Sequence, residues 1–529
     1  AELALEEGDA AMWYVWLVDD AKLAVEINAP ETCGVELLVE ADEDGETREV
    51  LREKRVLVKG RGTTQQTAFD LSQHAGQVGR LTLRPVDGCA EPVELSTAQL
   101  VVPGEQPQVP EEVEPPKYII FWMIDTLRAD YLPLHFETDV QAPELKRLAE
   151  NGASFEVAYV QGNESKTSHA SLFAGMYPSK HGVVGRGSLR RRHELLPEAL
   201  SDAGYKTGAH ISNGYVSQPW GFVQGWDHYV NNLRDGWRID GHSMAEHGAN
   251  WAKKNKDDKF FLYLGTIDPH VTYRRHEELI DRYDPEPYNG RYRAYLSGEE
   301  LGKIKGGGVK VSERDKKRIV ALYKNEIEFN DQAFGKLRKA LEDEGMWEDT
   351  MVVVTSDHGE EFWEHGSVGH GHNIHQELVH VPVIVHYPPL IPKGTVVEAG
   401  IDVLDLYPTI VDAAGGEIPE AVQGKSAIPL THNAHGGYPE PTIATQYRIH
   451  YAMQMQHFKL YLKRGEYELY ERESDPLEMK NVADTHPLAS RWLLDAMGYF
   501  RAHRKEWDKR TWGVPSKVAP GFVERIAGE

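Results

Sequence analysis

The stretch Tyr118-Ile-Ile-Phe-Trp-Met-Ile-Asp125 is an unbroken apolar run that ends in a carboxylate. Runs of this kind are typical of strands that are buried on both faces, as in a parallel sheet. Two later stretches follow the same plan, since Lys259 to Ile267 leads into Asp268 and Met351 to Ser356 leads into Asp357. Because the carboxyl ends of parallel strands meet at one edge of a sheet, we expect these carboxylates to lie together.

Predicted helices separate these strands. Helical patterns cover Pro143 to Asn151, Leu195 to Ala203 and Glu313 to Glu344. Alternation of strands and helices predicts the α/β class, with a mostly parallel sheet sandwiched by helices. The glycine-rich segment Gly302 to Val311 is predicted to be a mobile insertion.

The flanks of this α/β segment have a different pattern. Residues 1–102 show short alternating strands and predict an N-terminal antiparallel β-sandwich, an accessory domain. Residues 103–116 are rich in proline and glutamate and predict an extended linker. The α/β domain then spans residues 117–443, and residues 444–529 predict a small antiparallel subdomain with a closing helix from Leu488 to His503.

The composition narrows the classes of partner. The formal charge is −25, from 83 acidic against 58 basic residues, and such a surface disfavours binding to nucleic acid or to anionic membranes. No apolar run approaches the ~20 residues that a membrane-spanning helix requires. The two cysteines, Cys33 and Cys89, are compatible with one disulfide in an exported protein or with two buried thiols.

The strand-end aspartates predict a divalent metal site, because carboxylates gathered in one crevice repel one another unless a cation joins them. His358 directly follows Asp357, and Pro269-His270 follows Asp268. A carboxylate oxygen beside an imidazole nitrogen suits zinc or manganese better than calcium. The alternative is that each aspartate caps the turn or helix that follows it, which is a common structural role.

A loop with several hydroxyl groups runs directly into a helix. It reads Gly162-Asn-Glu-Ser-Lys-Thr-Ser-His-Ala-Ser-Leu-Phe-Ala-Gly-Met-Tyr-Pro178, and the helix is predicted to begin near Ser168. A nucleophile or a bound oxyanion at a helix N-terminus is stabilised by the positive end of the helix dipole. The other interpretation is that these serines and threonines are N-caps, and the local pattern alone leaves both open.

Taken together, these motifs resemble the successive blocks of the sulfatase family, a branch of the alkaline phosphatase superfamily. The resemblance rests on Ile124-Asp-Thr-Leu-Arg-Ala-Asp-Tyr131, Ser168 to Gly182, Asp268-Pro-His270, Ser356-Asp-His-Gly-Glu-Glu-Phe-Trp-Glu-His-Gly366 and Gly369-His-Gly371. The blocks stand in the family's order within residues 117 to 485. The resemblance implies the fold of that family and a metal-dependent ester hydrolase.

The resemblance also implies a metal site and a nucleophile. Ser165 corresponds to the family's covalent nucleophile. Asp125, Asp357 and His358 correspond to ligands of a divalent ion (Mn, Zn or Ca), and the oxygen of Ser165 lies against that ion. We therefore expect one divalent ion per chain, bound by these four residues.

Other positions correspond to groups around the substrate. His270 matches a residue near the leaving group, and His169 stands where sulfatases have the arginine of their signature. His370 matches a residue that contacts the anionic group of the substrate. We therefore expect His270 and His169 to be catalytic with the nucleophile, and His370, Lys166 and Thr167 to bind the substrate.

Relatives with two metal ions suggest an alternative. Asp268 and His270, with either His370 or His372, would form the second ligand cluster. The spacing of Asp268 and His270 matches those relatives poorly, so a single ion is expected.

One departure from the family changes the expected chemistry. Sulfatases convert the Cys or Ser of a Cys/Ser-x-Pro/Ala-x-Arg signature to formylglycine, but here the stretch reads Ser165-Lys-Thr-Ser-His169. The nucleophile is therefore expected to remain a serine hydroxyl. A seryl sulfate lacks the route by which a formylglycine hydrate expels sulfate, whereas a seryl phosphate can be hydrolysed by metal-activated water.

We therefore expect hydrolysis of phosphate or phosphonate esters. Hydrolysis of sulfate esters is the first alternative, and a non-catalytic binding protein on the same fold is the second. The expected substrate is a small-molecule, glycan or lipid ester. The expected location is the periplasm or the extracellular space, although no signal peptide is visible in this chain.

Overall fold

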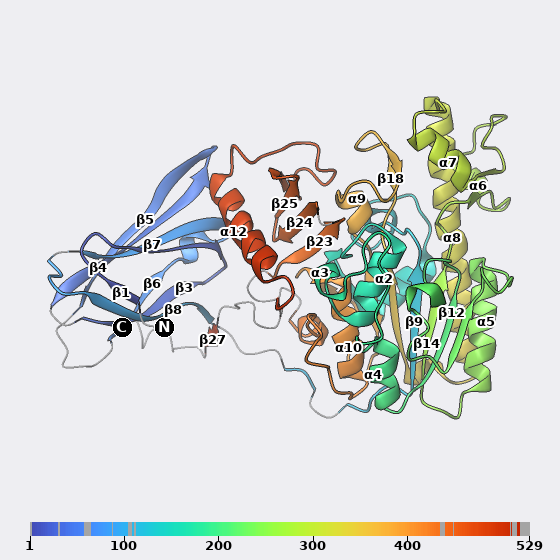
Figure 1. Cartoon of the computed structure of the whole chain (residues 1–529), viewed down its shortest axis with the longest axis horizontal. Coiled ribbons are helices and arrows are strands. Elements are labelled where there is room, and N and C mark those ends of the chain that lie inside the picture. Colours follow the sequence, from blue (N-terminus) through green and yellow to red (C-terminus); the bar gives the residue numbers. More distant parts are fainter. Residues whose placement is uncertain are drawn as a thin grey trace.

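The computed structural model of the 529-residue chain describes residues 3–29, 32–57, 65–86, 88–103, 108–110, 113–433, 440–447, 449–507, 509 and 516–518. Figure 1 shows the N-terminal sheets at one end of the molecule and the α/β part at the other, with the C-terminal sheet and helix between them. Residues 104–107 and 111–112 of the predicted linker lie outside the described residues.

A large, mostly parallel sheet forms the centre of the α/β part. Its strands lie in the order β13-β12-β14-β9-β17-β20-β10-β21. The first five strands of this order run parallel, and β20 is antiparallel to both of its neighbours. The bounds are β9 Tyr118–Ile124, β10 Ala153–Phe155, β12 Lys206–Ile211, β13 His228–Asn231, β14 Phe260–Thr266, β17 Thr350–Ser356, β20 Val383–His386 and β21 Thr395–Val397.

Helices cover both faces of this sheet, as the alternating pattern predicts. One apolar core packs α1, α5 and α8 against the sheet, and another packs α2, α4 and α10 against the opposite face. The bounds are α1 Pro143–Glu150, α2 Ser165–Ala174, α4 Leu196–Asp202, α5 Gly241–Lys254, α8 Glu313–Asp343 and α10 Leu406–Ala413. The predicted α/β class is therefore confirmed.

Shorter elements connect the layers. The segment predicted as a mobile insertion contains the end of a helix, α7 Gly298–Lys305. The other short elements are β11 Ala158–Tyr159, α3 Pro178–His181, β15 Tyr273–Arg274, α6 Ile280–Tyr283, β16 Tyr295–Leu296, β18 Glu361–Phe362, β19 Val368–Gly369, α9 Gln376–Val379, β22 Ile401–Asp402 and α11 Ile428–Thr431.

The N-terminal part consists of two sheets packed face to face. One has the order β1-β8-β3-β6 and the other β2-β7-β4-β5, and a single apolar core lies between them. A disulfide joins Cys33 to Cys89, which selects one of the two alternatives that the sequence left open. The bounds are β1 Leu3–Leu5, β2 Ala11–Leu17, β3 Lys22–Asn28, β4 Cys33–Glu43, β5 Glu46–Leu57, β6 Gln65–Asp70, β7 Gln77–Val86 and β8 Val93–Pro103.

The C-terminal part is an antiparallel sheet with a helix beside it. The strands are β23 Thr442–Gln446, β24 His450–Met455, β25 Phe458–Lys463 and β26 Glu466–Glu471, and the helix is α12 Pro487–His503. Trp492 of α12 stacks on Trp16 of β2, with ring centroids 6.1 Å apart. Strand β27 Ser516–Val518 returns to pair with β8. The C-terminal segment therefore contacts both other parts of the molecule.

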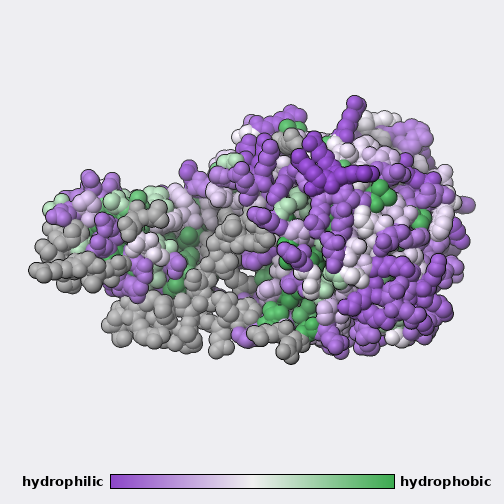
Figure 2. Space-filling model, turned by 60° about the horizontal axis from the view of Figure 1, so that its bottom comes forward, coloured by the Kyte–Doolittle hydropathy of each residue, from purple (hydrophilic) through white to green (hydrophobic). Residues whose placement is uncertain are grey.

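No helix in the described part of the chain is both long and apolar enough to cross a bilayer. The face in Figure 2 is mostly hydrophilic over the α/β part, as the 83 acidic residues lead one to expect. The predicted domain limits stay predictions, and two of them fall inside strands. β8 ends at Pro103, and β23 begins at Thr442.

Candidate active site

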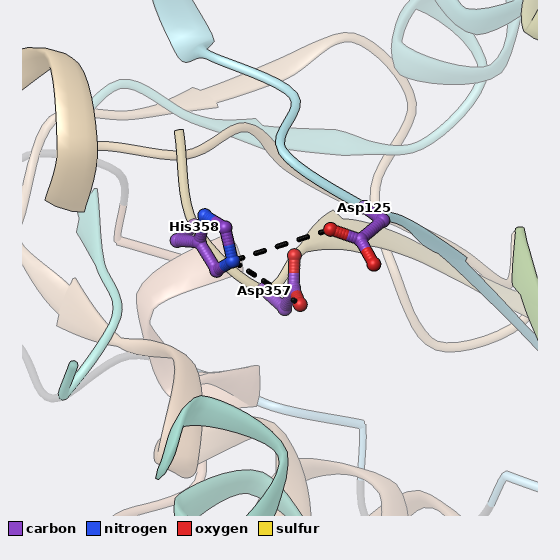
Figure 3. A group of neighbouring side chains, drawn as sticks. All are labelled: Asp125, Asp357 and His358. Atoms are coloured by element: carbon purple, nitrogen blue, oxygen red, sulfur yellow. Dashed lines mark ion pairs between the residues drawn. The ribbon is translucent and has the colours of Figure 1, made fainter. Parts of the chain in front are cut away.

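The ends of two neighbouring strands bring together an aspartate pair and a histidine. β9 and β17 pair in parallel with Ile124 opposite Ser356, so that Asp125 and Asp357 follow at the same edge. Nε2 of His358 lies 4.0 Å from Oδ1 of Asp125 and 3.7 Å from Oδ2 of Asp357 (Figure 3). The structure therefore places three of the predicted metal ligands within one cluster.

One oxygen of each carboxylate in this cluster is held by the protein. Oδ2 of Asp125 accepts a hydrogen bond from Nδ2 of Asn213 at 2.6 Å, and Oδ1 of Asp357 accepts one from the amide of Thr126 at 3.1 Å. The remaining oxygens, Oδ1 of Asp125 and Oδ2 of Asp357, are buried and have no hydrogen-bond partner. Buried polar atoms without a partner are costly, so this arrangement indicates a missing ligand.

The pKa shifts of Asp125 and Asp357 also favour a cation between them. Burial and the negative charge of Asp357 raise the pKa of Asp125 well above its usual range. Burial also acts to raise the pKa of Asp357, but His358 and His169 hold it below its usual value. Two buried carboxylates in one cluster repel each other when both are ionised, and a positive charge between them offsets that repulsion.

The donor set fits a divalent cation. Nδ1 of His358 donates to the carbonyl of Gly359 at 2.9 Å, which leaves the lone pair of Nε2 directed at the carboxylates. Two carboxylate oxygens and one imidazole nitrogen are ligands that zinc and manganese accept. The side chains of Asp125, Asp357 and His358 therefore fit a divalent metal ion.

Ser165 is the first residue of α2, three residues before the predicted start of the helix. Glu164 precedes it in extended backbone and makes no side-chain cap. The hydroxyl of Ser165 lies 3.3 Å from Nε2 of His358. The side chain thus stands at the positive end of a helix and beside the candidate metal cluster, which favours a charged oxygen there.

A cavity of about 980 Å³ opens beside Ser165. It extends from the start of α2 across the carboxyl ends of β12, β13 and β14, where ligands of open α/β sheets bind. Of the residues that the sequence suggested, the following line the cavity: Ser165, Lys166, Asp268, His270 and His370.

His370 and His270 face each other across one part of this cavity, with ring centroids 5.2 Å apart. Nδ1 of His370 donates to Oε1 of Glu360 at 2.9 Å, and Nδ1 of His270 donates to the carbonyl of Val271 at 2.6 Å. Within the described part of the chain the other nitrogen of each ring has no hydrogen-bond partner, so it can meet a substrate. Burial acts to raise the pKa of Glu360, but contact with His370 holds it at about 2.

The three other predicted residues on α2 lie in different surroundings. Lys166 lies over the ring of Trp220 at 3.7 Å and donates to the carbonyl of Gly185, at the wall of the cavity. Thr167 does not line the cavity and packs towards Gly162. His169 lies behind the metal cluster, where Nδ1 is 2.7 Å from the carbonyl of Ser165 and 3.6 Å from Oδ2 of Asp357.

The alternative second metal cluster does not come together among the described residues. Nε2 of His372 is engaged with Oε2 of Glu361 at 2.5 Å, and His372 does not line the cavity. Oδ2 of Asp268 accepts from the amide of Gly241 at 2.6 Å. His372 and Asp268 are therefore each bound to a different protein group and do not share a ligand site.

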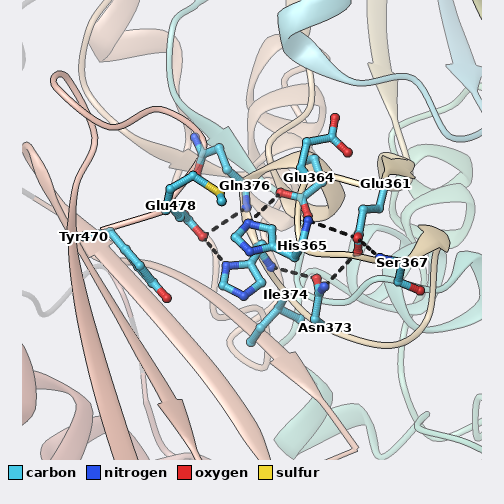
Figure 4. Close-up of polar contacts among 12 residues, drawn as sticks. Glu361, Glu364, His365, Ser367, Asn373, Ile374, Gln376, Tyr470 and Glu478 are labelled. Carbon is cyan, nitrogen blue, oxygen red and sulfur yellow. Dashed lines mark hydrogen bonds and ion pairs between the residues drawn. The ribbon is translucent and has the colours of Figure 1, made fainter. Parts of the chain in front are cut away.

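The loop that carries His370 is held by buried carboxylates on both sides (Figure 4). Glu361 accepts from the amide of Ser367 at 2.7 Å and from Nδ2 of Asn373 at 3.0 Å. Glu478, which follows the C-terminal sheet, accepts from Nδ1 of His375 at 2.7 Å. The C-terminal segment thereby stabilises one wall of the cavity.

Two contributors to this site were missed by the sequence analysis. Asn213 orients Asp125, and Glu360 orients His370. Asn213 follows β12, a strand that the sequence analysis did not single out, although a polar residue after a buried strand was the signal that identified the aspartates. Glu360 lies two residues after His358, within the quoted motif Ser356 to Gly366, but nothing in that motif by itself assigns it a role.

Comparison with known proteins agrees with the fold. The sulfatase family model matches residues 117–416, and a model of the C-terminal part of N-sulphoglucosamine sulphohydrolase matches residues 364–491. A sulfatase of Formosa agariphila is 24% identical over 445 residues, which cover 73% of this chain and 87% of that protein.

Solved structures share the fold at low sequence identity. A protein in complex with its substrate D-glucosamine-2-N,6-O-disulfate superimposes with a TM-score of 0.62 at 20% identity, covering 75% of this chain and 100% of the other. A phosphonate monoester hydrolase from Silicibacter pomeroyi has a TM-score of 0.61 at 20% identity, covering 74% and 96%. With more than half of its 529 residues matched by the family model, this chain belongs to the sulfatase family, whose members are metal-dependent ester hydrolases.

Proposed function

We propose that this chain hydrolyses phosphate or phosphonate esters, with Ser165 as covalent nucleophile. The observation that carries the proposal is the serine hydroxyl 3.3 Å from Nε2 of His358, at the N-terminus of α2 and open to the cavity. Thr167 and His169 stand where the formylglycine signature of sulfatases has Pro or Ala and Arg. An unmodified serine suits a phosphoryl intermediate better than a sulfuryl one.

Asp125, Asp357 and His358 would hold the metal ion, with the oxygen of Ser165 beside it. A divalent cation at that cluster would lower the pKa of the serine hydroxyl, so that its proton is released to water, and would offset the negative charge of the ester. Asn213 keeps Asp125 directed at the cluster through its 2.6 Å hydrogen bond. His169 holds the first turn of α2 and Asp357 in place from behind.

The remaining steps belong to residues of the cavity. The oxygen of Ser165 forms a bond to phosphorus as the bond to the leaving oxygen breaks, and Nε2 of His270 donates a proton to that oxygen. Lys166, at the cavity wall, offsets the charge of the anionic group of the substrate, and His370 contacts that group. In the second step His270 accepts a proton from water as water attacks phosphorus and the bond to Ser165 breaks.

A panel of four esters tests the proposal. Nitrophenyl phosphate, bis-nitrophenyl phosphate, nitrophenyl phenylphosphonate and nitrophenyl sulfate would be assayed with manganese or zinc. We expect turnover of at least one phosphorus ester and little turnover of the sulfate. A preference for the sulfate would overturn the phosphorus assignment, and no turnover of any ester would support a non-catalytic binding protein.

We further propose that the protein acts in the periplasm or outside the cell. The Cys33–Cys89 disulfide supports this location, because disulfides persist in oxidising compartments. The N-terminal sandwich of residues 1–102 is proposed to be an accessory domain, since the residues of the candidate site all come from later in the chain.

A further inference from the structure

The cavity extends well beyond the groups that would act on the ester. Past His270 it reaches a second end, formed by the segment after β14, the start of α5 and α8. Asp240, Asp268, His276 and Phe329 line this end. The proposed chemistry uses none of these four side chains.

Asp268 is fixed in place and has one oxygen to spare. Its side chain is 7% exposed, and the amide of Gly241 donates to Oδ2 at 2.6 Å. Nδ2 of Asn330 donates to the carbonyl of Asp268 at 3.0 Å, which holds the backbone. Oδ1 has no partner among the described residues, and the side chain forms part of the cavity wall. Oδ1 can therefore accept a hydrogen bond from a molecule bound in the cavity.

The charged groups around Asp268 already have partners of their own, and Nε of Arg238 lies 3.5 Å from Oδ2 of Asp240. Both oxygens of Asp240 are occupied, since they accept from the amide of Ser243 at 3.0 Å and from its hydroxyl at 2.8 Å. His276 is engaged with Glu326 at 2.9 Å. Burial and Glu326 raise the pKa of Asp268 well above its usual range. Oδ1 of Asp268 is therefore an acceptor at this end of the cavity that can meet a hydrogen-bond donor of a bound molecule.

We propose that Oδ1 of Asp268 binds a hydrogen-bond donor, a hydroxyl or an ammonium group, carried by the leaving alcohol of the substrate. This inference rests on the proposed function, because it assumes that the ester binds at Ser165 and extends along the cavity past His270. Asp268 is then a specificity-determining residue: it selects esters by a group remote from the bond that breaks.

The competing explanation is that Asp268 only caps α5. That role uses Oδ2 and the amide of Gly241. The substitution Asp268→Asn separates the two roles, because the amide oxygen can still accept from Gly241 while an NH2 group replaces the free acceptor. Asp240→Asn is a matched control, since Asp240 lines the same end but its oxygens already serve Ser243.

The experiment measures binding of alkylphosphonates to the full-length, manganese-loaded protein by calorimetry. Their tails of two to four carbons end in methyl, hydroxyl or ammonium, so that only the terminal group differs. For the wild type we expect about tenfold tighter binding of the best hydroxyl or ammonium tail than of the methyl tail. Asp268→Asn should remove that preference, and Asp240→Asn should keep it. Tighter binding of ammonium than of hydroxyl would identify a positively charged leaving group.

The inference and the proposed function can fail separately. Equal affinity for all three tails in the wild type, together with turnover of nitrophenyl esters, overturns the role of Asp268 alone. This comparison needs no variant, so it stands even where Asp268→Asn does not fold. A preference that survives Asp268→Asn in a folded protein also overturns it. No turnover of any nitrophenyl ester overturns the proposed function instead.

Discussion

The N-terminal sheets and the candidate metal cluster of the α/β part treat buried charge in opposite ways. Among the described residues up to 103, Glu36 is the one buried charged side chain, and Arg52 and Arg84 pair with it at 2.9 and 2.5 Å. In the α/β part, Asp125 and Asp357 are buried with unpartnered oxygens. The first region satisfies its buried charge internally, whereas the second leaves charges unsatisfied where a ligand is proposed to bind.

The largest expected effect is the loss of activity in Ser165→Ala. Removal of the nucleophile should lower kcat on the best phosphorus ester at least about 10³-fold. The melting temperature should stay close to that of the wild type, because the hydroxyl makes no hydrogen bond essential to the helix. Ser188→Ala, at an exposed position, is the control. Activity above a tenth of the wild type would assign the nucleophile elsewhere.

Asp125→Asn tests the contrast between the two regions most directly. We expect about 100-fold lower activity and weaker metal binding, because one of the three proposed protein ligands loses its charge. The metal-free protein should nevertheless be stabilised by about 1–2 kcal/mol, because asparagine is neutral and avoids the free-energy cost of a buried carboxyl with a raised pKa. Metal titration and denaturant unfolding after chelation measure the two effects.

Glu36→Gln is the matched change in the N-terminal sheets. It should lower the stability of the protein, whereas Asp125→Asn should raise that of the metal-free protein. Neutralising Glu36 removes the charge that pairs with Arg52 and Arg84, so the protein should unfold at lower denaturant concentration. Metal binding and turnover should not change. If Asp125→Asn and Glu36→Gln shift stability in the same direction, the contrast between the regions is wrong.

Loss of the disulfide should affect stability but not chemistry. Replacing Cys33 and Cys89 together by serine should destabilise the N-terminal sheets by about 2–4 kcal/mol, because the link closes a long loop of the unfolded chain. Hydrogen exchange, read by segment, should rise in residues 33–57 and stay unchanged in β9 and β17. A parallel fall in kcat would instead show that the sandwich supports the active site.

The smallest expected effect is a loss of stability in mild acid, confined to the α/β part. Burial lowers the pKa of His181 to about 3 and those of His380 and His386 to about 4. Between pH 6.5 and about 4 the unfolded chain therefore binds more protons at these histidines than the folded one, which lowers stability as the pH falls. Burial raises the pKa of Glu326 and of Glu377 to about 8, which acts in the opposite direction over the same range and keeps the net loss small. Hydrogen exchange at pH 7 and pH 5 should detect this in the α/β part first; equal loss in the N-terminal sheets would contradict it.

Much of the fold could be predicted because its signals are local. The apolar run of β9 matches the predicted strand residue for residue. α1 and α8 differ from the predicted helices by one residue at one end, and α4 by one residue at each end. The start of α2 was misplaced because the chain offers no capping side chain at Glu164, so no local signal marks Ser165 as the first helical residue.

The sequence by itself determined the class of the fold and the family, because apolar periodicity and motif order are properties of short segments. Of the three strand-end carboxylates that were expected to lie together, Asp125 and Asp357 do, whereas Asp268 lies apart and accepts from the amide of Gly241. Only the tertiary structure decided which polar groups contact these carboxylates and whether the two cysteines pair. Asn213 reaches Asp125 from 88 positions away, and Cys33 meets Cys89 from 56 positions away. Such pairings depend on how strands are ordered in space, and that order is a property of the whole packed chain.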